Sequence, residues 1–300
     1  MKITPTFNDN RINLKDRIPL NTPLVIYVEP SGFCNLRCSF CPNSIMKNKS
    51  KMTIDLFMKL IDELELFEDR IKLLRICGFG EPLLNKKIVD MIRYAYHKVE
   101  RIELVTNGLL LDWTFRFNLS RYVDRTIISL EGMTDEEYKK NACSKVNVGE
   151  LIKKIEHLCA SKLNSTIHVK VINTEYKELF FKTFDFCDEA YIENIVPLWA
   201  GFDSDKINTN RWGNKIIHKN ICPQIFKGLQ IYANGDVVPC CVDWERVNIL
   251  GNINTVSLAE IWKGSKLKEL QKEHLQGLKE SIKPCNKCLM NDYCEKDIIT

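Results

Sequence analysis

The chain of 300 residues lacks any apolar stretch that is long and uncharged enough to cross a bilayer. Residues 1–21 are polar and interrupted by proline, and they contain no apolar core of a secretory signal. We therefore expect a cytoplasmic protein without a membrane span. A strong charge bias is also absent, since 43 Lys and Arg stand against 39 Asp and Glu, for a formal net charge of +4. This balance indicates no nucleic-acid partner, although it is compatible with an anionic small molecule.

Histidine is scarce, and the five histidines form no pair with the spacing of metal ligands. We assign them no catalytic role. Internal repeats and low-complexity tracts are absent as well. Cysteine, in contrast, is abundant, with 13 residues. In a reducing compartment such thiols do not form a disulfide framework, and their close spacings indicate metal binding instead.

Short β-branched runs alternate with segments of helical periodicity from Pro23 to about Gly201. The expected strands are residues 24–27, 73–77, 102–106, 126–130, 167–172 and 191–196. The expected helices between them are residues 53–67, 88–96, 148–163 and 176–188. This alternation predicts an α/β fold of about six βα units, with a parallel sheet and right-handed crossovers.

The alternation stops near Gly201, and residues 202–219 show no convincing period. Beyond them, Asn234 and Gly235 stand between two apolar runs and predict a hairpin turn, because both positions tolerate positive φ. Helical segments follow near residues 257–262 and 266–276. The predicted parts are an N-terminal arm (1–22), a main α/β domain (23–205) and a small C-terminal domain (206–300).

Three cysteines with C-x3-C-x2-C spacing follow the first expected strand: Cys34, Cys38 and Cys41. Three thiolates leave one iron of a 4Fe-4S cluster open to a small-molecule ligand, as a catalytic zinc site keeps one position open. A structural zinc site completed by a distant ligand is the alternative, although zinc ligands usually occur as C-x2-C pairs.

This spacing, with the aromatic Phe40 directly before the last cysteine, resembles the cluster loop of the radical S-adenosylmethionine (radical SAM) superfamily. The resemblance implies a partial (β/α)6 barrel, similar to a TIM barrel, whose mouth holds the cluster, S-adenosylmethionine and the substrate. It also implies that the reduced cluster cleaves S-adenosylmethionine to a 5′-deoxyadenosyl radical, which abstracts a substrate hydrogen. A flavodoxin- or ferredoxin-type donor would supply the electron.

Further segments resemble superfamily motifs at the ends of later strands. Gly78-Phe-Gly80-Glu81 is similar to the glycine-rich turn whose backbone binds the amino group of the cosubstrate, and glycine permits such a close approach. Asn107 and Ser129 stand in segments similar to the common Thr-Asn-Gly and Ser-Leu-Asp-Gly motifs. The resemblance implies that one of them reaches the ribose or carboxylate of the cosubstrate, whereas ordinary turn chemistry is the alternative.

The sequence departs from the superfamily pattern after the fourth strand. Glu131 replaces the more frequent Asp, and the Arg that many relatives carry there is missing, which leaves Lys140 or Lys145 for that role. Cys143 is a candidate hydrogen donor, although a lone cysteine is more often an inert small side chain. Trp199 either lines the substrate site or packs beneath the C-terminal domain.

A second group of cysteines lies near the C-terminus, at positions 222, 240, 241, 285, 288 and 294. Their spacing resembles the SPASM domain, which carries auxiliary iron-sulfur clusters in many radical SAM enzymes. The full pattern requires a cysteine where this chain has Ile298, so the resemblance implies the shortened form with one auxiliary cluster, called a twitch domain. The implied ligands are Cys222, Cys240, Cys285 and Cys288, with Cys241 and Cys294 as alternatives. A zinc ribbon is the other interpretation.

A cluster held by four protein thiolates has no open iron, which favours electron transfer and therefore an oxidation. The cysteine intervals also resemble those of radical SAM dehydrogenases that oxidise 2-deoxy-scyllo-inosamine. Our first hypothesis is dehydrogenation of a hydroxylated small molecule, such as a sugar or aminocyclitol. The second is modification of a short ribosomal peptide by thioether formation or epimerisation. The third is a zinc-stabilised interaction protein without catalysis.

Overall fold

The computed structural model describes residues 14–195 and 221–288. These residues form one curved sheet of nine strands in the order β6-β5-β4-β3-β2-β1-β7-β8-β9. Neighbours from β6 to β7 are parallel, whereas β8 and β9 extend the sheet in antiparallel fashion. The strands are β1 (Val25–Val28), β2 (Leu73–Ile76), β3 (Ile102–Thr106), β4 (Arg125–Leu130), β5 (Thr166–Ile172), β6 (Glu189–Glu193), β7 (Gly228–Ile231), β8 (Asp236–Val238) and β9 (Gly251–Asn252).

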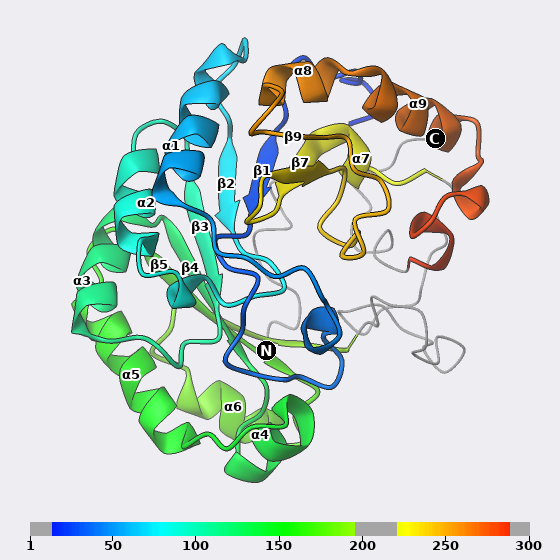
Figure 1. The fold of residues 1–300 in the computed structure, drawn as a ribbon. Coiled ribbons are helices and arrows are strands. Elements are labelled where there is room, and N and C mark those ends of the chain that lie inside the picture. Colours follow the sequence, from blue (N-terminus) through cyan, green and yellow to red (C-terminus); the bar gives the residue numbers. More distant parts are fainter. Residues whose placement is uncertain (1–13, 196–220, 289–300) are drawn as a thin grey trace.

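Helices follow most strands and cover the outer side of the sheet, as the arc from α1 to α6 in Figure 1 shows. The helices are α1 (Ile54–Glu63), α2 (Ile88–Ala95), α3 (Trp113–Tyr122), α4 (Asp135–Ala142), α5 (Val148–Ser161), α6 (Lys177–Thr183), α7 (Gln224–Lys227), α8 (Leu258–Lys263) and α9 (Ser265–Leu275). Ile167, Val169 and Val171 of β5 are fully buried on the helix-covered face. The intervening residues of each strand line the inner, concave face, because side chains alternate along a strand.

The predicted α/β fold is confirmed, and the structure differs from the prediction mainly after β3. Helices α3 and α4 were not predicted, because neither has a clear apolar stripe. In α4 only Tyr138 and Ala142 are buried, and the helix begins at Thr134, whose side chain accepts a hydrogen bond from Glu137 N at 3.1 Å. Residues 138–142 therefore form the last part of a helix.

The C-terminal segment joins the main sheet. Strand β7 pairs in parallel with β1, so that β1 lies between β2 and β7. The predicted hairpin connects β7 to β8, and Gly235 in its turn has φ +91°. The predicted boundary between residues 205 and 206 lies outside the described residues.

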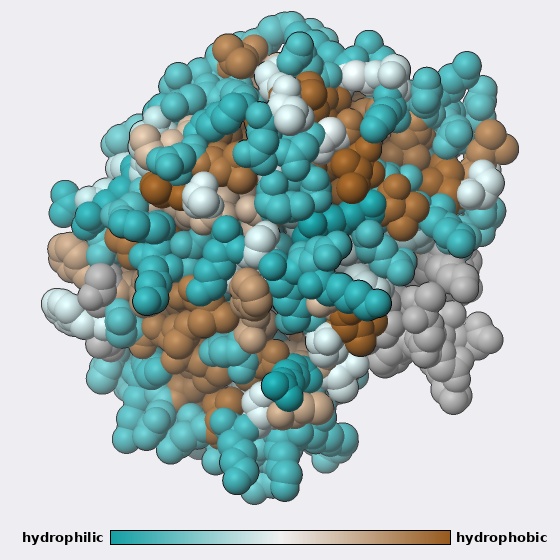
Figure 2. Space-filling model, in the orientation of Figure 1, coloured by the Kyte–Doolittle hydropathy of each residue, from teal (hydrophilic) through white to brown (hydrophobic). Residues whose placement is uncertain are grey.

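The surface in view is mixed in character, with hydrophilic side chains spread between smaller hydrophobic areas (Figure 2). Within the described ranges, no helix has the length and apolar character needed to cross a bilayer.

Candidate active site

The loop after β1 brings the first three cysteines to the carboxyl edge of the parallel strands, where ligands of such sheets bind. Cys41 N donates to the carbonyl oxygen of Cys38 at 3.0 Å, which closes a tight turn. Leu36 N donates to the sulfur of Cys34 at 3.4 Å. The backbone thus folds the loop so that the three thiols gather at one place.

These three thiols are free and largely shielded from solvent. Burial raises the pKa of Cys34 and Cys38, and it raises the pKa of Cys41 to about 12. A buried thiolate needs a compensating positive charge, and iron supplies one. The donor set therefore fits an iron-sulfur cluster with one iron left open.

The glycine-rich turn after β2 lies directly against this loop. A Cβ atom on Gly80 would overlap the carbonyl oxygen of Ser31, and a Cβ atom on Gly78 would lie 2.6 Å from Cγ of Glu29. Glu81 N donates to the carbonyl oxygen of Phe33 at 2.7 Å. Only glycine therefore lets the turn approach the cysteine loop this closely.

The carboxylate of Glu81 is buried and braces the turn from within. It accepts hydrogen bonds from Leu83 N (3.0 Å), Thr106 Oγ1 (2.7 Å) and Asn107 N (2.8 Å). Burial raises the pKa of this carboxyl group, and these bonds act against the rise. The side chain of Glu81 thus joins the turn to the end of β3, which makes it a positioning group for the site.

Of the other predicted cofactor residues, Asn107 has the most direct contact with the cysteine loop. Its Nδ2 donates to Asn35 Oδ1 at 2.7 Å and lies 3.9 Å from the sulfur of Cys34. Ser129 lies on the inner face near the end of β4. Phe40 is partly buried and packs against the main core. The cysteine loop, the glycine-rich turn and Asn107 therefore form one continuous site.

Sequence reasoning missed a cation at the mouth of the sheet. Lys170 is the register partner of Ser129 in β5, and its Nζ forms a 2.8 Å ion pair with Glu193 at the end of β6. Lys140 and Lys145, the predicted replacements for the missing Arg, are exposed. The signal available in the sequence was a single lysine within a mainly apolar strand.

Two buried carboxylates near the mouth had no role predicted from the sequence. Glu131 lies at the end of β4, and burial raises its pKa to about 7, although Lys170 acts to lower it. Glu29 follows β1 and accepts a hydrogen bond from Phe79 N at 3.1 Å. Burial raises the pKa of Glu29 to about 7 as well. Among the described residues, one oxygen of each has no hydrogen-bond partner.

Two ion pairs lie on the inner face near the amino ends of β3 and β4. Glu103 of β3 lies between Arg75 of β2, at 2.6 Å, and Arg125 of β4, at 3.0 Å. The inner face thus carries polar side chains both in this layer and at the Lys170–Glu193 pair. Such a surface suits a substrate with several hydrogen-bonding groups.

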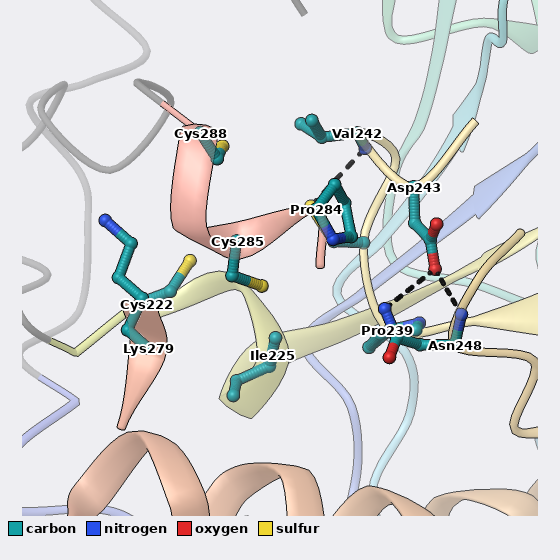
Figure 3. A pocket seen from close by; sticks show the side chains of 11 residues that line it. Cys222, Ile225, Pro239, Val242, Asp243, Asn248, Lys279, Pro284, Cys285 and Cys288 are labelled. Carbon is teal, nitrogen blue, oxygen red and sulfur yellow. Dashed lines mark hydrogen bonds between the residues drawn. The ribbon is translucent and has the colours of Figure 1, made fainter. Parts of the chain in front are cut away.

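The C-terminal cysteines form a second site. The predicted ligands Cys222, Cys240, Cys285 and Cys288 all line one cavity. Figure 3 shows Cys222 beside α7, with Cys285 and Cys288 on the short helical turn opposite. Burial raises the pKa of Cys222, and it raises that of Cys285 to about 12. The set of four shielded thiols fits a cluster in which every iron has a protein ligand.

The segments around this cavity are braced by polar contacts. Asp243 accepts a hydrogen bond from Asn248 N at 2.8 Å (Figure 3). It also accepts one from Val247 N at 2.9 Å, and Asn248 Nδ2 donates to the carbonyl oxygen of Lys283 at 2.6 Å. Cys222 N donates to Nδ1 of the buried His274 at 3.3 Å. Burial lowers the pKa of His274 to about 4, so this ring is neutral and can accept the bond.

The remaining cysteines have different surroundings. Burial raises the pKa of Tyr27 and Cys77, and the nearby Cys241 raises both further, which places Cys241 beside the ends of β1 and β2. Cys77 lies on the inner face, directly after β2. Cys143 is exposed at the end of α4 with φ 48°.

Cys159 and Cys187 pack against the core, with their sulfur atoms 3.5 Å apart. Trp199 and Cys294 lie outside the described residues. Within the described part of the chain, no three His, Cys, Asp or Glu side chains converge as ligands of a single metal ion.

Comparison with known families and proteins bears on this arrangement. The family model described as the radical SAM superfamily matches residues 28–187, and the SPASM model, an iron-sulfur cluster-binding domain, matches residues 222–289. An S-adenosyl-L-methionine-dependent 2-deoxy-scyllo-inosamine dehydrogenase from Niallia circulans is 26% identical, over 87% of this chain and 92% of that protein. A tungsten-containing aldehyde ferredoxin oxidoreductase cofactor-modifying protein from Pyrococcus furiosus is 23% identical, over 90% and 88%.

Solved structures share the fold. The crystal structure of BtrN in complex with AdoMet and 2-DOIA matches with a TM-score of 0.57 and 20% identity, over 88% of this chain and 92% of BtrN. Streptococcus suis SuiB bound to S-adenosylmethionine matches with a TM-score of 0.68 and 16% identity, over 95% and 75%. At these identities the likeness concerns the fold alone.

Proposed function

Because the chain belongs to the radical SAM superfamily and is an enzyme with iron-sulfur and S-adenosylmethionine cofactors, we propose that it dehydrogenates a hydroxylated small molecule of the sugar or aminocyclitol type. The observation that carries this proposal is the meeting of Cys222, Cys240, Cys285 and Cys288 around one cavity. Four thiols can fill every protein-ligand position of a second cluster, which leaves electron transfer as its role. The similarity to 2-deoxy-scyllo-inosamine dehydrogenase over most of both chains supports an oxidation.

In this proposal Cys34, Cys38 and Cys41 hold the first cluster. When bound, S-adenosylmethionine and the two clusters would supply the radical chemistry: abstraction of a hydrogen atom from a substrate carbon at the first site and acceptance of the remaining electron at the second, with loss of a proton from the hydroxyl group. The chain contributes ligation, orientation and a site shielded from water.

The cosubstrate would lie between the glycine-rich turn and the end of β4. The backbone of Gly78 and Gly80 can approach its amino group, because neither residue carries a side chain. Asn107 and Ser129 supply polar side chains on the next two strands, and Lys170 supplies a cation in place of the Arg that many relatives carry after this strand. Glu81 contributes indirectly, since its carboxylate holds the backbone of Asn107.

Turnover under anaerobic conditions tests the proposal. The reconstituted protein would be given a chemical reductant, S-adenosylmethionine and a panel that contains 2-deoxy-scyllo-inosamine, related polyols and short cysteine-containing peptides. We expect one hydroxylated compound to yield a ketone together with an equal amount of 5′-deoxyadenosine. Deuterium on carbon in heavy water without net oxidation would contradict dehydrogenation and favour epimerisation of a peptide.

Two cysteine variants separate radical formation from oxidation. Cys285→Ala/Cys288→Ala is expected to form 5′-deoxyadenosine but to lose the ketone, because the electron acceptor is missing. Cys143→Ala is expected to retain both products, since oxidation needs no hydrogen donor. Loss of product in the Cys143 variant would contradict the proposal and support the hydrogen-donor hypothesis.

A further inference from the structure

Two segments of the sequence contain lysine and arginine but neither aspartate nor glutamate. They are residues 30–54, which include the first cysteine loop, and residues 138–149, which include the end of α4. Their seven basic residues are Arg37, Lys47, Lys49, Lys51, Lys139, Lys140 and Lys145. The two segments thus carry more positive charge than the whole chain, whose formal net charge is +4.

The fold brings these segments together around the first cysteines. Arg37 N donates to the carbonyl oxygen of Ala142 at 3.0 Å, and Ser39 N donates to that of Asn141 at 2.9 Å. The two bonds flank Cys38, so the last turn of α4 lies against the outer side of the cysteine loop. Figure 1 shows α4 directly below the blue loop that follows β1. We call the seven basic residues of these segments the basic surface.

The basic surface is available to a partner. Six of its members are exposed, and only Lys49 is partly buried, where its Nζ donates to Asn43 Oδ1 at 3.0 Å. None of the seven forms an ion pair with a carboxylate among the described residues. The acidic side chains of α4, Asp135, Glu136 and Glu137, all lie in its first turn, whereas Lys139 and Lys140 lie in its last turn.

An anionic partner is therefore expected at this surface, and its position indicates which kind. The cysteine loop would hold the first cluster, and its residues Asn35, Arg37 and Ser39 are exposed, so an electron that arrives from outside would have a short path through the loop. We propose that the basic surface docks an acidic one-electron carrier protein, of the flavodoxin or ferredoxin type, that reduces the first cluster. Electrostatic steering suits such brief encounters, because complementary charge raises the association rate while the interface stays small. The inference rests on membership of the superfamily and is independent of the substrate.

Charge reversal on the two segments tests the inference. In Lys47→Glu/Lys139→Glu, the dissociation constant of oxidised flavodoxin, measured with the anaerobic holoprotein at low ionic strength, is expected to rise about tenfold. The rate at which reduced flavodoxin reduces the first cluster, followed by stopped-flow absorbance, is expected to fall by a similar factor. Reduction by dithionite is expected to match the wild type. The salt dependence of the flavodoxin rate should also weaken, because the variant has fewer attractive charges for salt to screen.

The control is Lys153→Glu/Lys268→Glu, which reverses two exposed lysines on α5 and α9. Both double variants lower the formal net charge from +4 to zero. The control should bind and accept electrons like the wild type. Equal weakening in both doubles would overturn the proposal, because net charge and not position would then decide binding. Unchanged flavodoxin binding in the first double, or a parallel loss of the dithionite rate, would overturn it as well.

Discussion

Glu29 stands directly after β1, where the cosubstrate turn and the C-terminal strands meet. Its carboxylate is 1% exposed, and Phe79 N donates to it at 3.1 Å. Burial raises its pKa from 4.5 to about 7, and Arg246 counteracts part of that rise. Between pH 4.5 and about 7, the native protein therefore retains a proton on Glu29 that the unfolded chain has released. The stability that this proton contributes is complete below pH 4.5 and is lost as the pH rises to about 7.

Glu29→Gln should remove this pH dependence, because Gln stays neutral and can still accept from Phe79 N. We expect the variant to equal the wild type in thermal midpoint near pH 5 and to exceed it at pH 8, by up to about 3 kcal/mol of unfolding free energy. Anaerobic thermal scans of both proteins across this range measure the difference. Glu269→Gln, at an exposed position of α9, is the control. A pH-independent difference would show that Glu29 is not protonated in the native state.

Gly80 allows a second prediction for a single residue. Gly80→Ala places a methyl group on the carbonyl oxygen of Ser31, and backbone cannot move aside as a flexible side chain can. We expect a loss of roughly 3 kcal/mol in stability and no measurable 5′-deoxyadenosine. Gly149→Ala in α5 is the matched control, since its nearest neighbouring atom lies 3.4 Å away. A Gly80 variant as active as that control would contradict the close approach of the turn.

The residues that the sequence could identify belong to motifs with a recognisable spacing. Cys34 and its partners lie on one short loop, and the spacing alone indicates their chemistry. Lys170, Glu29 and Glu131 come from separate strands, and only the pairing of β1 with β7 or of β4 with β5 shows what surrounds them. Their significance depends on burial and neighbours, which a sequence does not display.

At the scale of elements, strands and amphipathic helices were predictable because their apolar residues repeat at a regular period. α1 is the clearest case, with Phe57, Leu60 and Ile61 buried on one face. α4 was not predictable from the apolar pattern, because its stability comes from a capped N-terminus and two buried side chains. The pairing of β7 with β1 was not predictable either, because no local pattern indicates which distant strand will complete a sheet.

The pairing of β7 with β1 predicts the behaviour of a fragment that ends before β7. A fragment of residues 1–205 would lack β7 and leave β1 with an unpaired, apolar edge, which is a template for association. We expect the fragment to aggregate, whereas the full chain stays dispersed, in size-exclusion chromatography with light scattering. A monomeric fragment that unfolds cooperatively would show instead that the C-terminal part is an independent domain.

For the whole molecule, the fold class and both cysteine sites followed from the sequence, whereas the relation between the sites did not. The pairing of β1 with β7 places the two sites on one sheet, with Cys241 beside the ends of β1 and β2 and its neighbour Cys240 in the second site. The substrate remains unpredicted, because the inner face draws its polar groups from every strand between β2 and β6. Such a surface has no signature in any single segment.

The iron content of Cys34→Ala/Cys38→Ala/Cys41→Ala, reconstituted under anaerobic conditions, tests the central claim of two separate clusters most directly. The variant keeps the C-terminal thiols and loses only the first set. We expect about four irons per chain, against about eight in the wild type, and no 5′-deoxyadenosine. Zinc in place of iron in this variant would contradict the claim.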